Sequence, residues 1–463
     1  MIFERFEVPG LSQYSYAVGA GGSLAIIDPK RDIDTYINYA KSNGLRIAYV
    51  LETHIHADFA SGATALATQS GAELCLSRYT GGESFSYRFA HRAVSEGDEV
   101  PLGELTLKVL HTPGHTPEHI SFLLVEPRKS RAPIALFSGD FLFVGSVGRP
   151  DLLGDGEKEK LAKALYKSVQ RMQELPDGTE IFPGHGAGSL CGAGMSQRKQ
   201  STIGYERVSN PFFREQTETE FVETVLSVVP EFPDYYLRMK ELNSRGPDPV
   251  DELPGEEAFS PDLFEKRRDE TPAIVVDLRS QEAFGGTNIP SSFNIGAGQN
   301  LSMWSAWLLP YDRPILLVGD AQTDFDQARR SFLRVGLDHV CGSLQGGIQA
   351  WVEAGKDQAH ILQSSVRELK RLLEKEDAPA LLDVRSPAEW RSGHISGAIH
   401  IPAGELQKRL NELPAREILY VICGSGYRSS IASSILARTG RIKPVNVNGG
   451  MTAWRNQGFP EIN

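Results

Sequence analysis

Histidine and aspartate gather in four short stretches of the N-terminal half of the sequence: THIHADF, PGHT, SGDF and PGHG. Both are residue types that bind metal ions, and THIHADF places three of them at alternate positions. A single histidine is usually structural, but four separate stretches of this kind together predict a metal site. The candidate residues are His54, His56, Asp58, His115, Asp140 and His185. We expect His91, His111 and His119 to have structural or supporting roles.

A second chemical motif lies near the C-terminus, in CGSGYRSS. Cys423 is followed by two glycines and then by Arg428, and the loop stands between a strand-like run and a helix-like run. Such a loop turns its backbone N–H groups inward, and this nest stabilises an anion on the cysteine sulfur. The same arrangement favours the reactive thiolate form of a cysteine. The loop residues Gly424, Ser425, Gly426 and Tyr427 are therefore expected to surround an anionic sulfur.

The elements that position the metal-site residues are readable as apolar runs. Each histidine or aspartate stretch follows a run typical of a β-strand, and side chains at strand ends of an α/β sheet meet at one edge. We therefore expect the four stretches to form one site. The runs predict strands at 23–29, 46–52, 104–110, 120–126 and 133–139, and helices at 61–70 and 157–175.

The composition is that of a globular chain with several domains. The 463 residues are 40% apolar, and the net charge of -11 argues against nucleic acid or an anionic membrane as the main partner. Apolar runs are too short for a membrane span, and the N-terminus does not resemble a signal peptide. Four scattered cysteines do not suggest a disulfide framework, so we expect a reducing compartment, the cytoplasm.

The C-terminal half contains two similar copies of one unit. VVDLRSQEAF (275–284) resembles LLDVRSPAEW (381–390), ILLVGD (315–320) resembles LYVICG (419–424), and GGIQAW (346–351) resembles GGMTAW (449–454). The pairs occur in the same order, which indicates a duplicated domain. A Pro-, Gly- and acid-rich stretch at 243–262 is typical of a linker. The domain boundaries that we predict are 1–245, 246–358 and 359–463.

The histidine and aspartate motifs, in this order, resemble the metallo-β-lactamase superfamily in its glyoxalase II-like branch, over roughly the first 240 residues. The resemblance implies an αββα sandwich with the metal at the strand ends. In the two-metal hydrolases of this superfamily, the second ion uses the residue after the Asp58 position, which is Phe59 here. A phenylalanine ring cannot donate to a metal, so a single ion is expected.

The branch that matches best is the persulfide dioxygenases, whose resemblance implies one Fe(II) per chain held by His54, His115 and Asp140. Two histidines and one carboxylate are a preferred set for non-haem iron that binds dioxygen. His56, Asp58 and His185 are then expected to orient ligands or water, or to contribute to the metal site.

Residues from about 360 to 463 resemble a rhodanese sulfurtransferase, which implies that Cys423 carries a persulfide and that Arg428 contacts an anion. A Cys-x4-Arg loop suits sulfane sulfur, whereas phosphatases of related fold use a longer loop. The middle copy places Gly319 at the position of Cys423 and Asp324 at that of Arg428. It resembles a rhodanese without its nucleophile, with a structural role as spacer, docking surface or contact in a homo-oligomer. Both copies are expected to be α/β domains with mainly parallel sheets.

Together the resemblances imply an enzyme of sulfide detoxification. A low-molecular-weight thiol persulfide would be oxidised with O₂ to sulfite, and the rhodanese would form thiosulfate from sulfite, or run in reverse. The alternative is a zinc glyoxalase II-like thioester hydrolase with a fused rhodanese. The thiol carrier, glutathione, coenzyme A or another, is left open.

Two further residues have two interpretations each. Arg149, in GRPD, either contacts substrate or braces its loop. Cys191 stands six residues after His185 in the Gly-rich stretch PGHGAGSLCG. It either packs a turn or acts as a thiol that exchanges sulfur with a small persulfide beside the iron.

Overall fold

The computed structural model describes residues 1–81, 86–228, 232–250 and 252–463. The chain divides into two compact units, of which the first comprises residues 1–251 with 333–336. The second unit comprises residues 252–332 and 337–463.

Two six-stranded sheets form the first unit in the described part of the chain. The first sheet runs in chain order through β1 (Ile2–Val8), β2 (Gln13–Ala20), β3 (Ser23–Ile27), β4 (Arg46–Leu51), β5 (Glu73–Ser77) and β6 (Arg92–Val94). The second sheet has the order β14-β13-β10-β9-β8-β7. Its strands are β7 (Glu99–Leu102), β8 (Leu105–His111), β9 (Ile120–Glu126), β10 (Ser130–Gly139), β13 (Glu180–Pro183) and β14 (Ser201–Thr202).

The two sheets pack face to face around a common apolar core. Val18 and Leu51 of the first sheet lie in one buried cluster with Leu107, Phe122 and Phe137 of the second. These strands are rich in β-branched, aromatic and leucine side chains, which suit a surface buried between sheets.

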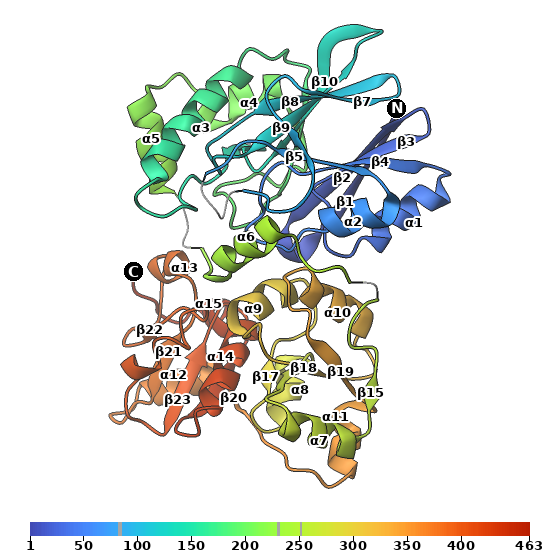
Figure 1. Ribbon diagram of the computed structural model, residues 1–463. Coiled ribbons are helices and arrows are strands. Elements are labelled where there is room, and N and C mark those ends of the chain that lie inside the picture. Colours follow the sequence, from blue (N-terminus) through green and yellow to red (C-terminus); the bar gives the residue numbers. More distant parts are fainter. Residues whose placement is uncertain (82–85, 229–231, 251) are drawn as a thin grey trace. The chain divides into compact units, whose positions relative to one another are not determined.

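Helices cover the outer face of each sheet, as Figure 1 shows. On the first sheet these are α1 (Asp34–Ser42) and α2 (Ala63–Ser70), whose Tyr36 and Leu66 are buried against Ile26 and Val50. The remaining helices of the unit are α3 (Lys158–Met172), α4 (Ile203–Ser209), α5 (Glu218–Ser227) and α6 (Tyr235–Arg245). The αββα sandwich predicted from the sequence is confirmed.

The helix α3 illustrates how the sequence specifies this packing. Leu161, Leu165, Val169 and Met172 recur every three or four positions, so they form one apolar face. Leu165 and Val169 pack into the cluster that contains Leu136 of β10. The polar positions of the helix remain on the solvent side.

The second unit contains two sheets with the same strand order, and both are five-stranded where the chain is described. The middle copy has the order β15-β19-β18-β16-β17, and the C-terminal copy has β20-β24-β23-β21-β22. Every strand pair in both sheets is parallel. The predicted duplication of an α/β domain with mainly parallel sheets is therefore confirmed.

The elements of the middle copy are β15 (Ala258–Phe259), α7 (Pro261–Glu270), β16 (Ile274–Asp277), α8 (Gln281–Gly286), β17 (Phe293–Asn294), α9 (Leu301–Leu308), β18 (Ile315–Val318), α10 (Phe325–Leu333), β19 (Val340–Leu344) and α11 (Gly347–Glu353). Those of the C-terminal copy are β20 (Leu362–Ser365), α12 (Val366–Leu373), β21 (Ala380–Asp383), α13 (Pro387–Arg391), β22 (Ile399–His400), β23 (Ile418–Ile422), α14 (Tyr427–Ala437), β24 (Lys443–Asn448) and α15 (Gly450–Asn456).

Both copies keep a buried Asp-x-Arg turn after equivalent strands. Arg279 pairs with Asp277 at 2.5 Å, and Arg385 pairs with Asp383 at 2.6 Å. In each case the guanidinium also donates to a main-chain carbonyl further along the loop. Buried charges need such complete pairing, so this repeated motif is structural.

Candidate functional site

Three of the predicted metal ligands converge in the first unit. His54 follows β4, His115 lies in the loop between β8 and β9, and Asp140 follows β10. The Nε2 atoms of His54 and His115 lie 3.9 and 3.7 Å from Asp140 Oδ2. One ligand atom of each residue lies within 4.8 Å of the others, and all three side chains are buried.

The inward-facing atoms of this set fit a cation. Among the described residues, His54 Nε2, His115 Nε2 and Asp140 Oδ2 are buried without a hydrogen-bond partner. Their outward atoms are all engaged: His54 Nδ1 with Thr53, Asp140 Oδ1 with His185, and His115 Nδ1 with the Arg149 carbonyl. Unpaired buried polar atoms each cost about 1–3 kcal/mol. Three such atoms facing one point are therefore the signature of a ligand set.

The protonation states agree with metal binding. Burial lowers the pKa of His54 well below its usual value, and the neighbouring His56 lowers it further. Burial also lowers the pKa of His115 to about 4, although Asp140 opposes this shift. Both imidazoles are therefore neutral near pH 7, which is the form that donates to a metal.

The other three predicted residues surround this set through hydrogen bonds. Both ring nitrogens of His185 lie 2.7 Å from a carboxylate oxygen, Nδ1 from Asp140 and Nε2 from Asp58. His56 Nε2 lies 3.2 Å from Asp28 Oδ1, while its Nδ1 has no hydrogen-bond partner among the described residues. The contacts of His185 are those of a residue that orients a ligand.

Asp28 is a supporting residue that the sequence analysis missed. Its carboxylate accepts hydrogen bonds from the Thr53 amide at 2.7 Å and the Thr53 hydroxyl at 2.9 Å, besides facing His56. The backbone of Asp28 has a φ of 51°, a conformation that non-glycine residues rarely adopt. The signal in the sequence was an aspartate directly after the strand run SLAII.

Phe59 is fully buried beside the histidines. Its ring centroid lies 4.3 Å from that of His56 and 6.4 Å from that of His185. The phenylalanine therefore places an apolar ring, which has no atom that could bind a metal, beside His56 and His185.

A second group of residues with ligand atoms within 4.8 Å of one another comprises Asp58, His185 and Cys191. Both nitrogens of this histidine are already engaged by carboxylates. Burial raises the pKa of the Cys191 thiol well above its usual value, and the Asp58 and Asp140 carboxylates raise it further. The thiol is therefore protonated in this arrangement.

Arg149 is held by its own loop. Two of its guanidinium nitrogens donate to Asp151 at 2.7 and 2.8 Å, and a third donates to the Leu190 carbonyl at 2.8 Å. Its amide donates to the Cys191 carbonyl. These contacts brace the GRPD loop against the stretch that carries Cys191, whereas contact with a substrate stays a prediction.

Asn243 is a second residue that the sequence analysis did not assign to the site. Its side-chain amide donates to the carbonyls of His56 and Phe59, both at 2.8 Å, and its Oδ1 accepts the Ser61 amide at 2.9 Å. The side chain thus holds the backbone of the THIHADF loop. The linker-like composition from 243 onward was misleading here, because α6 continues to Arg245.

The Cys423 loop lies between β23 and the N-terminus of α14. The Gly426 amide donates to Cys423 Sγ at 3.1 Å, and the Ser429 hydroxyl oxygen lies 3.4 Å from the same sulfur and 3.1 Å from the Gly426 carbonyl. Gly426 has a φ of +112°, which a residue with a side chain would rarely adopt. One backbone N–H of the loop thus faces the sulfur, whereas the cradling role of the whole loop stays a prediction.

The arginine of this loop is paired with a carboxylate. Arg428 donates two hydrogen bonds to Glu389, at 2.6 and 2.7 Å. Tyr427 lies at the start of α14, and its hydroxyl donates to the Gly296 carbonyl of the middle copy at 3.1 Å. The predicted anion contact of Arg428 stays a prediction, and Glu389 is a partner that the sequence analysis missed.

The middle copy has no nucleophile at the equivalent place. Gly319 follows β18 as Cys423 follows β23, and the loop turns on contacts between Thr323 and Asp320. A Cβ atom at Gly319 would lie 2.6 Å from the Thr323 hydroxyl oxygen. The side-chain space of a cysteine is therefore filled in this copy.

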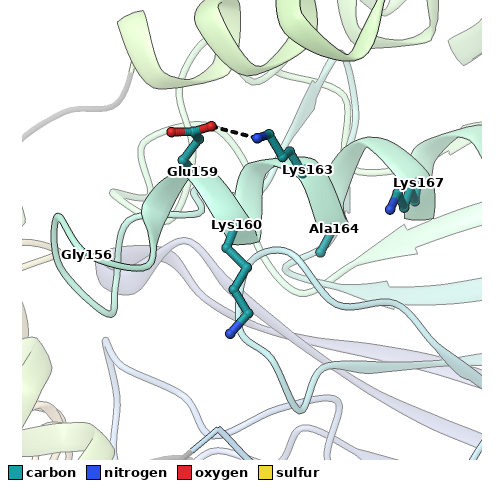
Figure 2. Close-up of a pocket in the computed structure, with 6 residues that line it drawn as sticks. All are labelled: Gly156, Glu159, Lys160, Lys163, Ala164 and Lys167. Carbon is teal, nitrogen blue, oxygen red and sulfur yellow. Dashed lines mark hydrogen bonds and ion pairs between the residues drawn. The ribbon is translucent and has the colours of Figure 1, made fainter.

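A surface hollow of about 580 Å³ lies over α3, apart from these residues (Figure 2). Its lining is Gly156, Glu159, Lys160, Lys163, Ala164 and Lys167. Lys163 pairs with Glu159 and Lys160 with Glu157. Paired lysines on an exposed helix face are a solvated surface and supply no chemistry of their own.

No helix in the described ranges is long and apolar enough to cross a membrane.

Comparison with known proteins adds to this geometry. Residues 8–185 match the metallo-beta-lactamase superfamily, and residues 260–354 and 365–457 each match the rhodanese-like domain. A solved structure of a metallo-beta-lactamase from Staphylococcus aureus is 37% identical, with a TM-score of 0.65. The match covers 74% of this chain and 98% of that one.

Two curated proteins have different activities. The persulfide dioxygenase ETHE1 of Mus musculus is 29% identical over 216 residues, which are 46% of this chain and 75% of the mouse protein. A hydroxyacylglutathione hydrolase of Anaeromyxobacter dehalogenans is 35% identical over 189 residues, which are 40% of this chain and 65% of that protein. The chain belongs to the metallo-β-lactamase superfamily, and its metallo-β-lactamase domain is followed by two rhodanese-like domains.

Proposed function

We propose that the N-terminal domain is a persulfide dioxygenase with one Fe(II) per chain, held by His54, His115 and Asp140. The observation that carries the proposal is a set of three buried ligand atoms, two imidazole nitrogens and one carboxylate oxygen, that face one another and have no hydrogen-bond partner in the described part of the chain. Phe59 supports a single ion, because it occupies the position next to Asp58 with an apolar ring. The similarity to the mouse persulfide dioxygenase points in the same direction.

The overall reaction converts a thiol persulfide, O₂ and water into the thiol, sulfite and protons. Iron, when bound, supplies the redox chemistry by which O₂ oxidises the terminal sulfur. The protein's own contribution is to fix its ligands. His185 orients Asp140, the Arg149 carbonyl fixes the His115 tautomer, and Asn243 holds the loop of His54 and His56.

We propose that the C-terminal domain transfers sulfur through Cys423. The thiolate attacks the outer sulfur of a persulfide, the S–S bond breaks, and the thiol leaves with the electron pair and a proton. Sulfite then attacks the outer sulfur of the Cys423 persulfide, which forms thiosulfate and returns the thiolate. The Gly426 amide and the Ser429 hydroxyl stabilise the thiolate of Cys423 before the attack and after thiosulfate has formed. Transfer from thiosulfate to Cys423 is the reverse of the second step.

Further parts of the proposal follow from the same reading. We propose domain boundaries after residues 245 and 358. The middle domain is proposed to have a structural role, which includes a contact in a homo-oligomer. The protein is proposed to act in sulfide detoxification in the cytoplasm. Cys191 is proposed as a thiol that exchanges sulfur near the iron. Because burial raises the pKa of this thiol, it must lose its proton before it can attack a persulfide. Low-molecular-weight thiol persulfide, O₂, sulfite and thiosulfate are the proposed small-molecule partners.

The test is oxygen uptake by the iron-loaded chain with glutathione persulfide, with sulfite and thiosulfate quantified at the end. The proposal expects O₂ consumption that depends on iron, and thiosulfate formation that depends on Cys423.

The rival function is a zinc thioester hydrolase. It is favoured by the similarity to the hydroxyacylglutathione hydrolase and by the second group of Asp58, His185 and Cys191. Hydrolysis of a glutathione thioester without O₂ uptake would support the rival.

A further inference from the structure

The guanidinium of Arg428 is committed to Glu389 in the sulfur-transfer loop. The two side chains form a bidentate pair with distances of 2.6 and 2.7 Å, the geometry of the strongest ion pairs. Burial alone would raise the pKa of Glu389, but Arg428 and the Ser386 amide bring it down to about 2. The carboxylate is therefore charged at any working pH, and it cancels the charge of the loop arginine.

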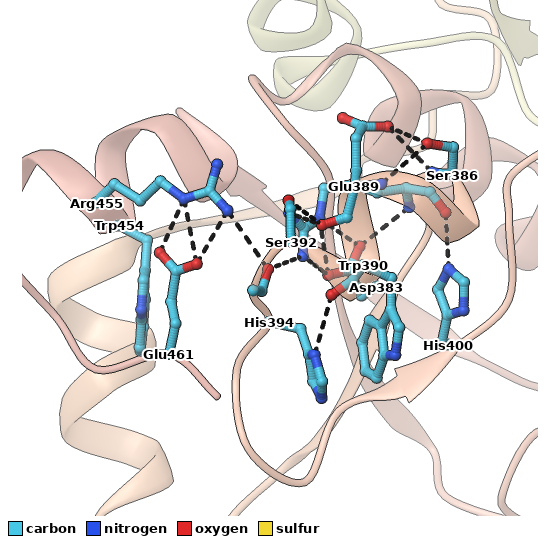
Figure 3. Close-up of polar contacts among 12 residues, drawn as sticks. Asp383, Ser386, Glu389, Trp390, Ser392, His394, His400, Trp454, Arg455 and Glu461 are labelled. Atoms are coloured by element: carbon cyan, nitrogen blue, oxygen red, sulfur yellow. Dashed lines mark hydrogen bonds and ion pairs between the residues drawn. The ribbon is translucent and has the colours of Figure 1, made fainter. Parts of the chain in front are cut away.

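Two other guanidinium groups of this domain are also paired with carboxylates. Arg385 pairs with Asp383 at 2.6 Å, and Arg455 pairs with Glu461 at 2.9 Å, a contact visible in Figure 3. The atoms that the structure directs at Cys423 Sγ are a neutral amide and a neutral hydroxyl. The loop therefore stabilises one negative charge on sulfur by local dipoles, and these three paired arginines add no net positive charge.

The carboxylate of Glu389 is not required for the local helix. Ser386 caps α13 by accepting the Glu389 amide, and Glu389 completes a capping box by accepting the Ser386 amide (Figure 3). In the middle copy, Ser280 caps α8 by accepting the amide of Ala283 at the equivalent position. That helix begins normally without a carboxylate there.

The two copies also differ together at both ends of the ion pair. The middle copy, which has Gly319 in place of the nucleophile, has Ala283 at the Glu389 position and Asp324 at the Arg428 position. The acid and the arginine thus occur with the reactive cysteine and are both missing without it. This association indicates that the pair serves the chemistry of the loop rather than the fold of the domain.

We propose that Glu389 determines which sulfur donor the Cys423 loop accepts, by neutralising Arg428 and so disfavouring dianionic thiosulfate relative to an organic persulfide. The inference rests on the proposed sulfurtransferase function and adds its donor class. Thiosulfate carries two negative charges next to the sulfur that is attacked, and its S–S bond breaks with sulfite leaving with the electron pair. An organic persulfide carries at most one charge at this end, and the group that leaves is a thiol.

The consequence is a preference among donors. A loop with little net positive charge binds dianionic thiosulfate weakly. Organic persulfide is then the favoured donor, whereas the balance between sulfite and thiosulfate, which are both anions, follows their concentrations.

Glu389→Gln tests this directly, because glutamine removes the charge and retains the capping box. Cyanide serves as the acceptor for both donors, thiosulfate and glutathione persulfide, with the full iron-loaded chain in the absence of O₂, so that the proposed dioxygenase does not consume the persulfide. We expect the KM for thiosulfate to fall about tenfold with little change in kcat. The kcat/KM for glutathione persulfide should change by less than about twofold. Glu389→Ala, which copies the residue of the middle copy, should give the same shift.

The matched control is Glu417→Gln. Glu417 precedes β23 and pairs with the exposed Lys443. The substitution therefore removes one carboxylate at the end of the strand opposite to Cys423. It should leave both donors unaffected. If the kcat/KM values for the two donors kept the same ratio in Glu389→Gln, either unchanged or changed equally, the inference would be overturned while the sulfurtransferase function stood. Absence of transfer from either donor in the unaltered chain would instead remove the proposed sulfurtransferase, and the inference with it.

Discussion

Replacing Asn243 by alanine should loosen the metal site without touching a ligand. The amide of Asn243 makes three hydrogen bonds, to the His56 and Phe59 carbonyls and from the Ser61 amide. Asn243 is only 2% exposed, so water does not readily replace the lost partner. Each hydrogen bond contributes about 1 kcal/mol net, which gives a loss of about 3 kcal/mol in the stability of the N-terminal domain.

The loss should appear in metal retention because the three contacts hold the loop that carries His54. We expect iron to pass to a competing chelator at least about tenfold faster from Asn243→Ala than from the unaltered chain. The assay is the rate of chelator colour development under anaerobic conditions, with calorimetry of the same preparations. The calorimetric transition of the N-terminal domain should move to lower temperature.

Asn210→Ala is the matched control for this prediction. Asn210 is also a buried asparagine of the same unit with three hydrogen bonds, to the Ser146 carbonyl, to Glu206 and from the Phe212 amide. It should cost similar stability and leave iron retention nearly unchanged. If the two variants lost iron at the same rate, the special role that we assign to Asn243 would be refuted.

Two other variants separate the two proposed activities, and a third tests the role of Cys191. Asp140→Ala should abolish oxygen uptake and leave sulfur transfer from thiosulfate to cyanide, as measured with an oxygen electrode and a thiocyanate assay. Cys423→Ser should keep oxygen uptake but accumulate sulfite in place of enzymatically formed thiosulfate, and loss of uptake would show that the domains depend on each other. Cys191→Ser should slow persulfide oxidation without changing iron content, and mass spectrometry should find one added sulfur atom on Cys191 of the unaltered chain. An unmodified Cys191 with unaltered kinetics would return that residue to a packing role.

The sequence predicted the strands that carry long apolar runs. The run at 120–126 coincides with β9, and the runs at 46–52 and 104–110 match β4 and β8 within one residue at each end. The first two strands of the chain, with seven and eight residues, were not predicted although their length is ordinary, and short strands such as β6, with three residues, were not predicted either. A strand of a few residues lacks the length over which periodicity becomes visible. The ligand loops were found because they follow the long strands directly.

The supporting residues were harder to predict because their partners are distant in the sequence. Asn243 contacts the His56 loop across most of the N-terminal domain, and Glu389 reaches Arg428 from α13, 39 positions earlier in the sequence. The position of the Asp28 side chain depends on an unusual backbone conformation, which no residue pattern in the sequence predicts. Local periodicity reports elements and motifs, whereas these contacts arise from the way that the elements pack.

The central claim is one redox-active iron ion at His54, His115 and Asp140. The most direct measurement is elemental analysis of anaerobically purified protein, combined with oxygen uptake on the same samples at graded iron occupancy. The account predicts one iron per chain and persulfide-dependent O₂ uptake that rises in proportion to iron. Two zinc ions per chain, with thioester hydrolysis that requires both and no oxygen uptake, would contradict it.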